Sequence, residues 1–215
     1  RHKQKHADLT PAEKTQYLSV VQQLSWPARS TMPALCYKVS ELQQKAATAK
    51  VSDLQEVNTA LAMAKEAAKA GACTWFRAGL FDPSKMLVTA VHDASFANQE
   101  GRASQQGRVL ALGSVESLEQ AKAMPFMPID WGSSKIHRVV RSTLAAEAAS
   151  ASDALDKATM IRFVMSQVLH GQDDIPWPQA CAKVPFLLLT DCRSLADHCN
   201  KTGSTVSEKR VALDI

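Results

Sequence analysis

The first seventy residues carry apolar side chains at the spacing of an α-helix. After Thr10, Pro11 and Glu13, four apolar residues recur at helical spacing, namely Tyr17, Leu18, Val21 and Leu24. Thr and Glu three residues apart form a capping box, and Pro fits the first helical position. The pattern therefore predicts a helix capped by Thr10 and ended by Pro27, because proline disrupts the interior of a helix.

Two further helices are predicted before residue 75. The second begins near Met32 and Pro33 and carries the apolar residues Leu35, Val39 and Leu42. The third begins at Ser52, with Gln55 as its capping partner, and stops at Gly71, a suitable residue after a helix end. Residues 1–75 are thus expected to form a helical segment.

From residue 85 onward the pattern changes to the alternation of strands. Residues 85–93 alternate and end in an acid, residues 108–115 follow a glycine-containing turn, and residues 124–131 are a third strand candidate. Short connections between them favour a meander of three antiparallel strands.

A long helix and a fourth strand follow. Ser142 or Thr143 caps the helix, which closes at Gly171. Residues 186–190 are a continuous apolar run, which predicts a strand covered on both faces, and a short helix spans 194–199. The apolar stripe expected to face the core along the long helix is Leu144, Ala148, Ala151, Leu155, Ala158, Met165 and Val168.

The order of these elements predicts an α/β fold with a mixed sheet. The strand at 186–190 is best placed parallel to the strand at 85–93, because the connection is long and contains a helix, as a right-handed crossover requires. The fold class is therefore a sheet of three antiparallel strands plus one parallel strand with a long helix, preceded by an α-helical segment.

Composition narrows the class of protein. The chain has 215 residues, of which 46% are hydrophobic and 21% charged, which excludes a disordered or fibrous protein. No apolar run approaches the roughly 20 residues of a membrane span. The net charge is +4, but Arg1, Lys3 and Lys5 supply most of it, so charge alone does not indicate nucleic-acid binding.

Cysteine usage and the chain ends give two more expectations. Five cysteines without a signal peptide favour free thiols and an intracellular protein, cytoplasmic or nuclear and not secreted. The absence of an initial Met and the apolar ending VALDI suggest a piece of a longer polypeptide. The cysteines are Cys36, Cys73, Cys181, Cys192 and Cys199.

Three acidic residues carry the candidate chemistry. Asp93 and Asp191 follow strands predicted to be parallel neighbours, so their carboxylates are expected at one sheet edge, on backbones about 4.8 Å apart. Glu147, in the opening turns of the long helix, is expected to supply a third. Such anions repel unless a cation separates them, and oxygen ligands suit Mg²⁺ or Mn²⁺. Two such ions are a known device for displacement at phosphorus.

Several segments around these acids resemble a known family. VHDASFAN, IDWGSSKIHRVVRSTLAAEA and LLLTDCRSLADH look like the ribonuclease H domain of copia-type retrotransposon polyproteins. YLSVVQQLSWPARSTMPALCYKVSELQ, with the helix that ends at Gly71, is similar to the helical tail that follows the reverse transcriptase palm in these polyproteins. The resemblance covers the chain from about Thr10 to Ile215.

The resemblance implies a function and a domain division. Asp93, Glu147 and Asp191 fall on three catalytic carboxylates that hold two Mg²⁺ ions and hydrolyse the RNA strand of an RNA–DNA hybrid. Residues 1–75 correspond to the reverse transcriptase tail, whose partner is the palm domain of the same polyprotein, with no membrane involved. Residues 85–215 correspond to a ribonuclease H-like domain truncated at its C-terminus, because the fourth carboxylate of the family lies beyond KRVALDI. Asp214 is not assigned to the site.

The chain also departs from the family pattern near these residues. Ala145, Ala148 and Cys192 stand where the family usually has an acid, an aromatic residue and an asparagine. The alternative function is therefore a catalytically silent relic that folds and at most binds nucleic acid. An integrase-like enzyme is disfavoured, because Glu147 precedes Asp191 instead of following both aspartates.

Each acid also has a purely structural interpretation. Asp191 could cap the short helix, Asp93 could begin a turn, and Glu147 could be a favourable charge at a helix start. His92 should face the opposite side of the strand from Asp93 and is interpreted as a packed or partly exposed histidine and not as a ligand.

Other polar clusters are weighed in the same way. Lys135, Arg138 and Arg141 form a basic stretch before the long helix, either a solvated turn or contacts to nucleic-acid phosphates. Trp131 either covers core or stacks on a nucleotide. A zinc site at Cys192, His198 and Cys199 is disfavoured, since no paired C-x-x-C is present.

Overall fold

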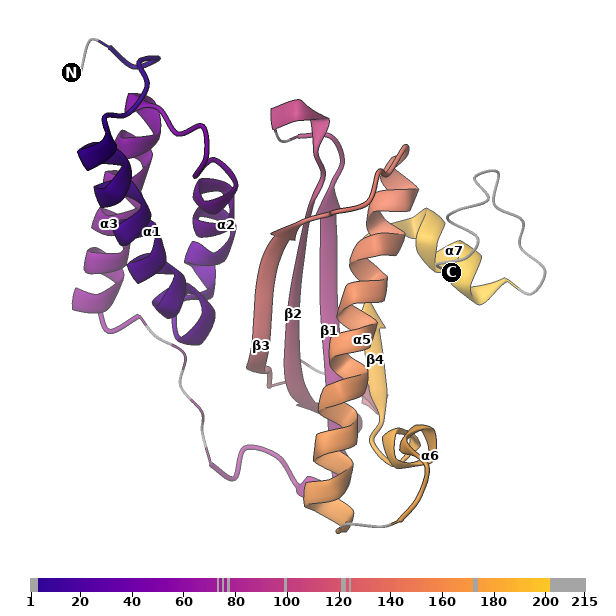
Figure 1. Cartoon of the computed structure of the whole chain (residues 1–215). Coiled ribbons are helices and arrows are strands. Elements are labelled where there is room, and N and C mark those ends of the chain that lie inside the picture. The colour runs from indigo at the N-terminus through magenta and orange to yellow at the C-terminus, as the bar shows by residue number, and fades with distance from the viewer. Residues whose placement is uncertain are drawn as a thin grey trace. The chain divides into compact units, whose positions relative to one another are not determined.

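The computed structural model divides the chain into two compact units, residues 1–75 and 76–215 (Figure 1). It describes residues 4–72, 74, 76, 78–98, 100–120, 123, 125–171 and 174–201. Asp214 and the other residues after 201 lie outside this described part, as does Cys73. Each unit has its own buried core.

The first unit is made of helices. They are α1 (Pro11–Ser30), the 3₁₀ turn η1 (Pro33–Leu35), α2 (Cys36–Gln44) and α3 (Val51–Lys69). The predicted capping box is confirmed, since the Thr10 hydroxyl accepts from the Glu13 N–H and the Glu13 carboxylate accepts from the Thr10 N–H. Tyr17 is fully buried and donates its hydroxyl hydrogen to the Leu42 carbonyl at 2.6 Å.

Two predicted boundaries in this unit are wrong. Pro27 lies inside α1, because a proline in the last turn removes a single backbone bond while its own carbonyl still accepts from Thr31 and Met32. The capping partner of α3 is Asp53 and not Gln55. The N-cap is Lys50, two residues before the expected Ser52, so Asp53 takes the position expected for Gln55 and accepts from the Lys50 N–H at 2.8 Å.

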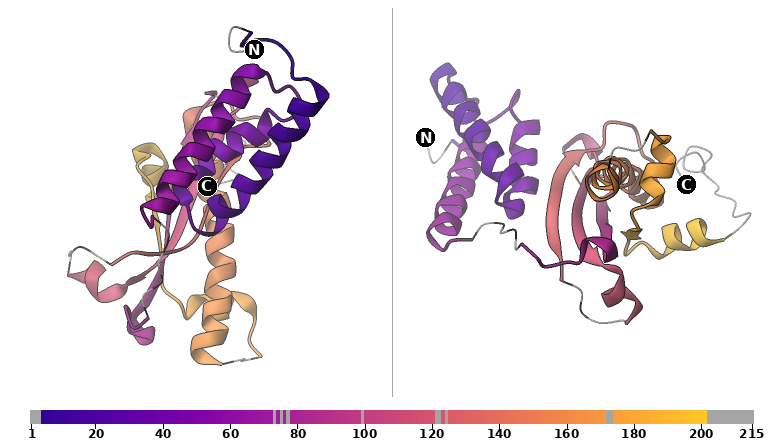
Figure 2. Two further views of the ribbon diagram at one scale, coloured as in Figure 1. Left: turned by 90° about the vertical axis from the view of Figure 1, so that its left-hand side faces the viewer. Right: turned by 90° about the horizontal axis from the view of Figure 1, so that it is seen from below.

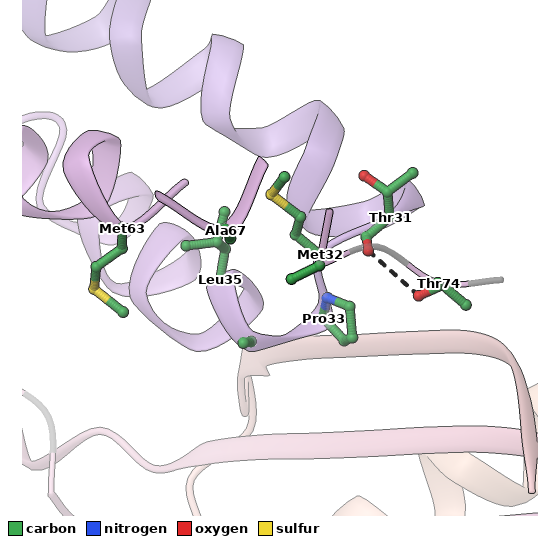
Figure 3. Close-up of a pocket in the computed structure, with 9 residues that line it drawn as sticks. Thr31, Met32, Pro33, Leu35, Met63, Ala67 and Thr74 are labelled. Carbon is green, nitrogen blue, oxygen red and sulfur yellow. Dashed lines mark hydrogen bonds between the residues drawn. The ribbon is translucent and has the colours of Figure 1, made fainter. Parts of the chain in front are cut away.

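An apolar pocket of about 330 Å³ lies in the helical unit (Figure 3). Next to it, the backbone N–H and the hydroxyl of Thr74 both donate to the Thr31 carbonyl, at 3.1 and 3.3 Å. None of the residues that line the pocket has an ionisable side chain. They are Thr31, Met32, Pro33, Ala34, Leu35, Met63, Ala67, Ala72 and Thr74.

The second unit contains a four-stranded mixed sheet in the order β3-β2-β1-β4. Its strands are β1 (Met86–Ser95), β2 (Gln105–Ser114), β3 (Met127–Lys135) and β4 (Phe186–Leu189). The first three form the predicted antiparallel meander, and β4 runs parallel to β1 with Val91 opposite Leu189. The predicted mixed sheet is therefore confirmed.

One long helix, α5 (Thr143–His170), covers a face of this sheet, as its end-on view in Figure 2 shows. Ser142 caps it by accepting from the Ala145 N–H, and Gly171 ends it with a φ of 83°. Among the described residues, no helix is both long and apolar enough to cross a bilayer. The remaining elements are η2 (Pro83–Lys85), η3 (Glu100–Arg102), α4 (Val115–Glu119), α6 (Trp177–Ala182) and α7 (Arg193–Asn200).

The buried face of α5 differs from the predicted stripe. Ala154 and Ala158 are fully buried against the sheet, whereas Leu155 is 43% and Val168 73% exposed. Apolar residues occur all round this helix, so periodicity does not select one face. Small alanines face the sheet and allow the helix to lie close to the strands.

The prediction that the fourth strand is covered on both faces is also wrong. In the described residues β4 is an edge strand, and its residues are half-buried or exposed, with Leu189 41% exposed. Only the side that carries Phe186 and Leu188 packs into the core beneath α5. A continuous apolar run therefore indicates a strand without fixing how many of its faces are covered.

Candidate metal centre

Three carboxylates meet at one edge of the sheet. Asp93 lies on β1, Glu147 in the second turn of α5, and Asp191 two residues after the end of β4. One carboxylate oxygen from each lies within 4.8 Å of the other two. The expected convergence is found, because the parallel pairing of β1 and β4 brings both aspartates to the same edge. The first strand continues two residues past Asp93, to Ser95.

The three acids differ in exposure. Asp93 and Asp191 are exposed, whereas Glu147 is only 4% exposed. The Ala94 N–H donates to Glu147 Oε1 at 3.3 Å. The other oxygen, Oε2, is buried without a hydrogen-bond partner. The centre therefore has two carboxylates open to solvent and one held beneath them.

Burial shapes the acidity of Glu147. It raises the pKa of this carboxyl from an ordinary 4.5 to about 7, partly offset by the Ala94 N–H and reinforced by the negative charges of Asp93 and Asp191. The ionised form thus lacks the compensation that a buried anion needs.

A backbone contact fixes α5 over this edge. Ser150, one turn after Glu147, is 1% exposed and donates its hydroxyl hydrogen to the Asp93 carbonyl at 2.9 Å, with the Gly107 carbonyl at 3.3 Å. Arg108 on β2 also pairs with Asp153 on α5 at 2.6 Å. Sequence analysis missed Ser150, although its spacing of three from Glu147 places both on one helix face.

His92 lies on the other side of the strand from Asp93 and is buried, as predicted. Its neighbour was not foreseen, because α5 covers that face and places His92 Nδ1 3.6 Å from Glu147 Oε2. Burial lowers the pKa of His92, against the opposing effect of Asp93 and Asp191. Both ring nitrogens are buried without a hydrogen-bond partner.

The donor set fits a hard divalent cation. All three ligands are carboxylate oxygens, which Mg²⁺ and Mn²⁺ prefer, and the buried unpartnered Oε2 of Glu147 has spare acceptor capacity. In the described part of the chain, no lysine or arginine forms an ion pair with any of the three. The residues present therefore suit a cation supplied from outside the chain.

A soft-metal centre finds no support in the same region. Within the residues that the structure describes, the three carboxylates are the only group of three or more potential metal ligands close enough to share an ion. Cys192, His198 and Cys199 do not form one, and the Cys192 thiol instead lies 3.3 Å from the Ser194 hydroxyl.

The alternative interpretations of Asp191 and Trp131 can be compared with the structure. Cys192 occupies the N-cap position of α7, so Asp191 is not its cap. Trp131 is 7% exposed and belongs to the core, so the stacking interpretation is not supported. The three basic residues are exposed: Lys135 is the last residue of β3, and Arg138 and Arg141 lie between β3 and α5.

Comparisons of the chain with protein-family models, with curated proteins and with solved structures found no match. Function is therefore inferred from the geometry of this edge together with the sequence pattern that leads to it.

Proposed function

We propose that this chain is a metal-dependent ribonuclease H that hydrolyses the RNA strand of RNA–DNA hybrids. The observation that carries the proposal is the convergence of Asp93, Glu147 and Asp191 within 4.8 Å at one sheet edge. A mixed sheet covered by a long helix is compatible with a ribonuclease H-like fold. The resemblance of the three segments around these acids supports the same assignment.

In this proposal the three carboxylates hold two Mg²⁺ or Mn²⁺ ions. When bound, these ions supply Lewis acidity for displacement at phosphorus, by activating water and stabilising the leaving oxygen. Asp93 and Asp191 are exposed and therefore accessible from the side where a phosphodiester would arrive. Glu147 is fixed from below by the Ala94 N–H and presents a buried oxygen with free acceptor capacity.

The substrate is a polyanion, which a bare cluster of carboxylates would repel. Lys135, Arg138 and Arg141 are exposed on the segment that leads into α5, and we assign to them contacts with backbone phosphates. Such contacts position the duplex without reading its sequence. Recognition of the RNA strand then depends on its 2′-hydroxyl groups.

The helical unit has a separate place in the proposal. Its core is formed by its own helices α1, α2 and α3, which is consistent with a module attached to another domain. We assign it to the tail of a reverse transcriptase, with the palm domain of the same retrotransposon polyprotein as its partner. The nuclease function does not depend on this part of the assignment.

The direct test is hydrolysis of a labelled RNA–DNA hybrid by the full chain with Mg²⁺. Asp93→Asn removes one charged ligand with little change in volume, and cleavage should be lost. Asp197→Asn is the matched control, because Asp197 is an exposed acid on α7 outside the cluster. Equal cleavage by the wild type and Asp93→Asn would refute the role of Asp93.

The silent-relic alternative is favoured by the alanines at 145 and 148 and by Cys192 beside the ligands. Calorimetric titration with Mn²⁺ separates the two functions. Binding of Mn²⁺ together with hybrid cleavage supports the enzyme, and binding without cleavage supports the relic. Absence of Mn²⁺ binding would contradict the metal centre itself.

A further inference from the structure

We infer that His92 is a positioning residue for Glu147, which it holds by donating a hydrogen bond from Nδ1 to carboxylate oxygen Oε2. This inference deepens the proposed function, because it assigns a residue that shapes the metal centre without binding metal. It concerns a histidine that the sequence pattern identified only as a packed residue.

The geometry singles out this pair of atoms. His92 points to the face of the sheet that α5 covers, and its side chain is 0% exposed. Its Nδ1 lies 3.6 Å from Glu147 Oε2, about 0.6 Å beyond the usual N–H···O distance. Both atoms are buried without a hydrogen-bond partner, so each lacks what the other offers. A small rotation of the ring or the carboxylate closes the bond.

The chemistry of the two groups fixes the direction of the bond. An ionised carboxylate only accepts hydrogen bonds, so the imidazole must be the donor whenever Glu147 is charged. A buried unpaired anion is costly, and a hydrogen bond to a charged group is among the stronger ones. Closing the Nδ1–Oε2 gap therefore stabilises the charged form of Glu147 that a cation requires.

The neighbouring residue on the same side of β1 completes the arrangement. The Ala94 N–H already donates to Oε1 of Glu147 at 3.3 Å. With His92 on Oε2, each carboxylate oxygen is held by one donor from β1 and keeps a lone pair for a cation shared with Asp93 and Asp191. Outer hydrogen bonds of this kind orient metal ligands, and their loss typically costs about 10–100-fold in metal affinity.

The first test compares Mn²⁺ affinity by calorimetry on the full chain. His92→Leu keeps an apolar side chain of similar size but removes the donor, and we expect affinity to fall about 10–100-fold. His92→Asn restores an N–H close to the position of Nδ1 and should stay within about threefold of the wild type. His170→Leu is the matched control, an exposed histidine at the far end of α5, and should leave the affinity unchanged.

A merely structural role would give a different pattern. Urea unfolding without metal should remain a single cooperative transition in His92→Leu, since leucine fills a buried site of similar size. Equal Mn²⁺ affinity of the leucine variant and the wild type would overturn the inference. Equal losses in the leucine and asparagine variants would overturn it as well.

A second measurement uses the wild-type chain and needs no metal. Nitrogen NMR of the histidine rings at pH 8.5 should show His92 with its proton on Nδ1, and this signal should shift in Glu147→Gln. A proton on Nε2 would contradict the inference. Failure of the wild type to bind Mn²⁺ would refute the proposed function separately, since the tautomer reports on the His92–Glu147 bond alone.

Discussion

Two clusters of acidic side chains in this protein differ in how their negative charge is balanced. In the helical unit, Lys45 contacts the carboxylates of Glu41, Asp53 and Glu56 at 3.3 to 3.6 Å, and Lys38 contacts two of these acids. Burial opposes the charged form of Lys45, yet Glu41 and Glu56 overcome it and raise its pKa. Acids and bases are thus matched within the chain.

At the sheet edge, the acids have no lysine or arginine partner among the described residues. Glu147 is more buried than any acid of the helical network, and its nearest charged neighbours are two further acids. Its pKa is raised to about 7, whereas the hydrogen bond from Lys38 lowers the pKa of Glu56. Lysines of the chain balance the acids of the helical network, whereas the acids at the sheet edge lack such a balancing charge in the described residues. An external cation at the edge, as the proposed function requires, would supply the missing positive charge.

The largest expected effect is on stability through Glu147. Its pKa is higher folded than unfolded, so the unfolded chain loses the proton first and stability falls as pH rises from about 4.5 to about 7. Above about pH 7 the free energy of unfolding is lower by about 3 kcal/mol, because each unit of pKa difference corresponds to about 1.36 kcal/mol. Glu147→Gln should therefore be more stable than the metal-free wild type by about 3 kcal/mol at pH 8, and equal to it near pH 4.

Urea unfolding in EDTA at several pH values measures this difference. The lowered pKa of His92 acts in the opposite direction, adding stability as pH rises, so the difference between wild type and variant is informative and the wild-type curve alone is not. If the difference in unfolding free energy between Glu147→Gln and the wild type does not change with pH, Glu147 is not an uncompensated buried acid, and the two clusters do not differ in this respect.

The next effect is stabilisation by metal. Mn²⁺ at 100 times its dissociation constant should stabilise the wild type by about 2.7 kcal/mol, because it binds only the folded chain. Asp191→Asn should lose most of this gain, and Lys45→Met should keep it. Thermal unfolding with and without Mn²⁺ tests both, and an equal gain in Asp191→Asn would place the ion elsewhere.

A smaller loss is expected from breaking the helical network. Lys45→Met removes the ion pair of Asp53 and leaves Glu41 and Glu56 with Lys38 as their lysine partner, and it should destabilise the chain by about 1–2 kcal/mol. Lys69→Met is the control, since its pair with Glu66 is exposed and should contribute nothing measurable. If Lys45→Met is neutral in urea unfolding, the network is not a stabilising element.

The smallest effect concerns the basic segment. Replacing Lys135, Arg138 or Arg141 by alanine should weaken hybrid binding at every sequence, and each loss should reduce the slope of log affinity against log salt by about 1. Fluorescence anisotropy at several salt concentrations measures the slope. An unchanged slope in all three variants would exclude these residues from the interface.

Some elements could be predicted from residues close together in the sequence. The Thr10–Glu13 capping box and the Ser142 cap each involve side chains that bond backbone groups three residues away, so they depend on residues close together in the chain. The change from helical to strand periodicity near residue 85 also depends only on residues close together in the chain. Pro27 and Asp53 show the limit of this reasoning, since each boundary shifted by a few residues.

Periodicity and chain connection are enough to predict the order of the elements, the mixed sheet and the positions of Asp93 and Asp191 near the ends of parallel strands. The face of α5 that meets the sheet, the burial of Glu147 and its approach to His92 depend instead on how the helix packs. The reason is physical: a helix with apolar residues all round can bury any of its faces, and the packing of the sheet selects one.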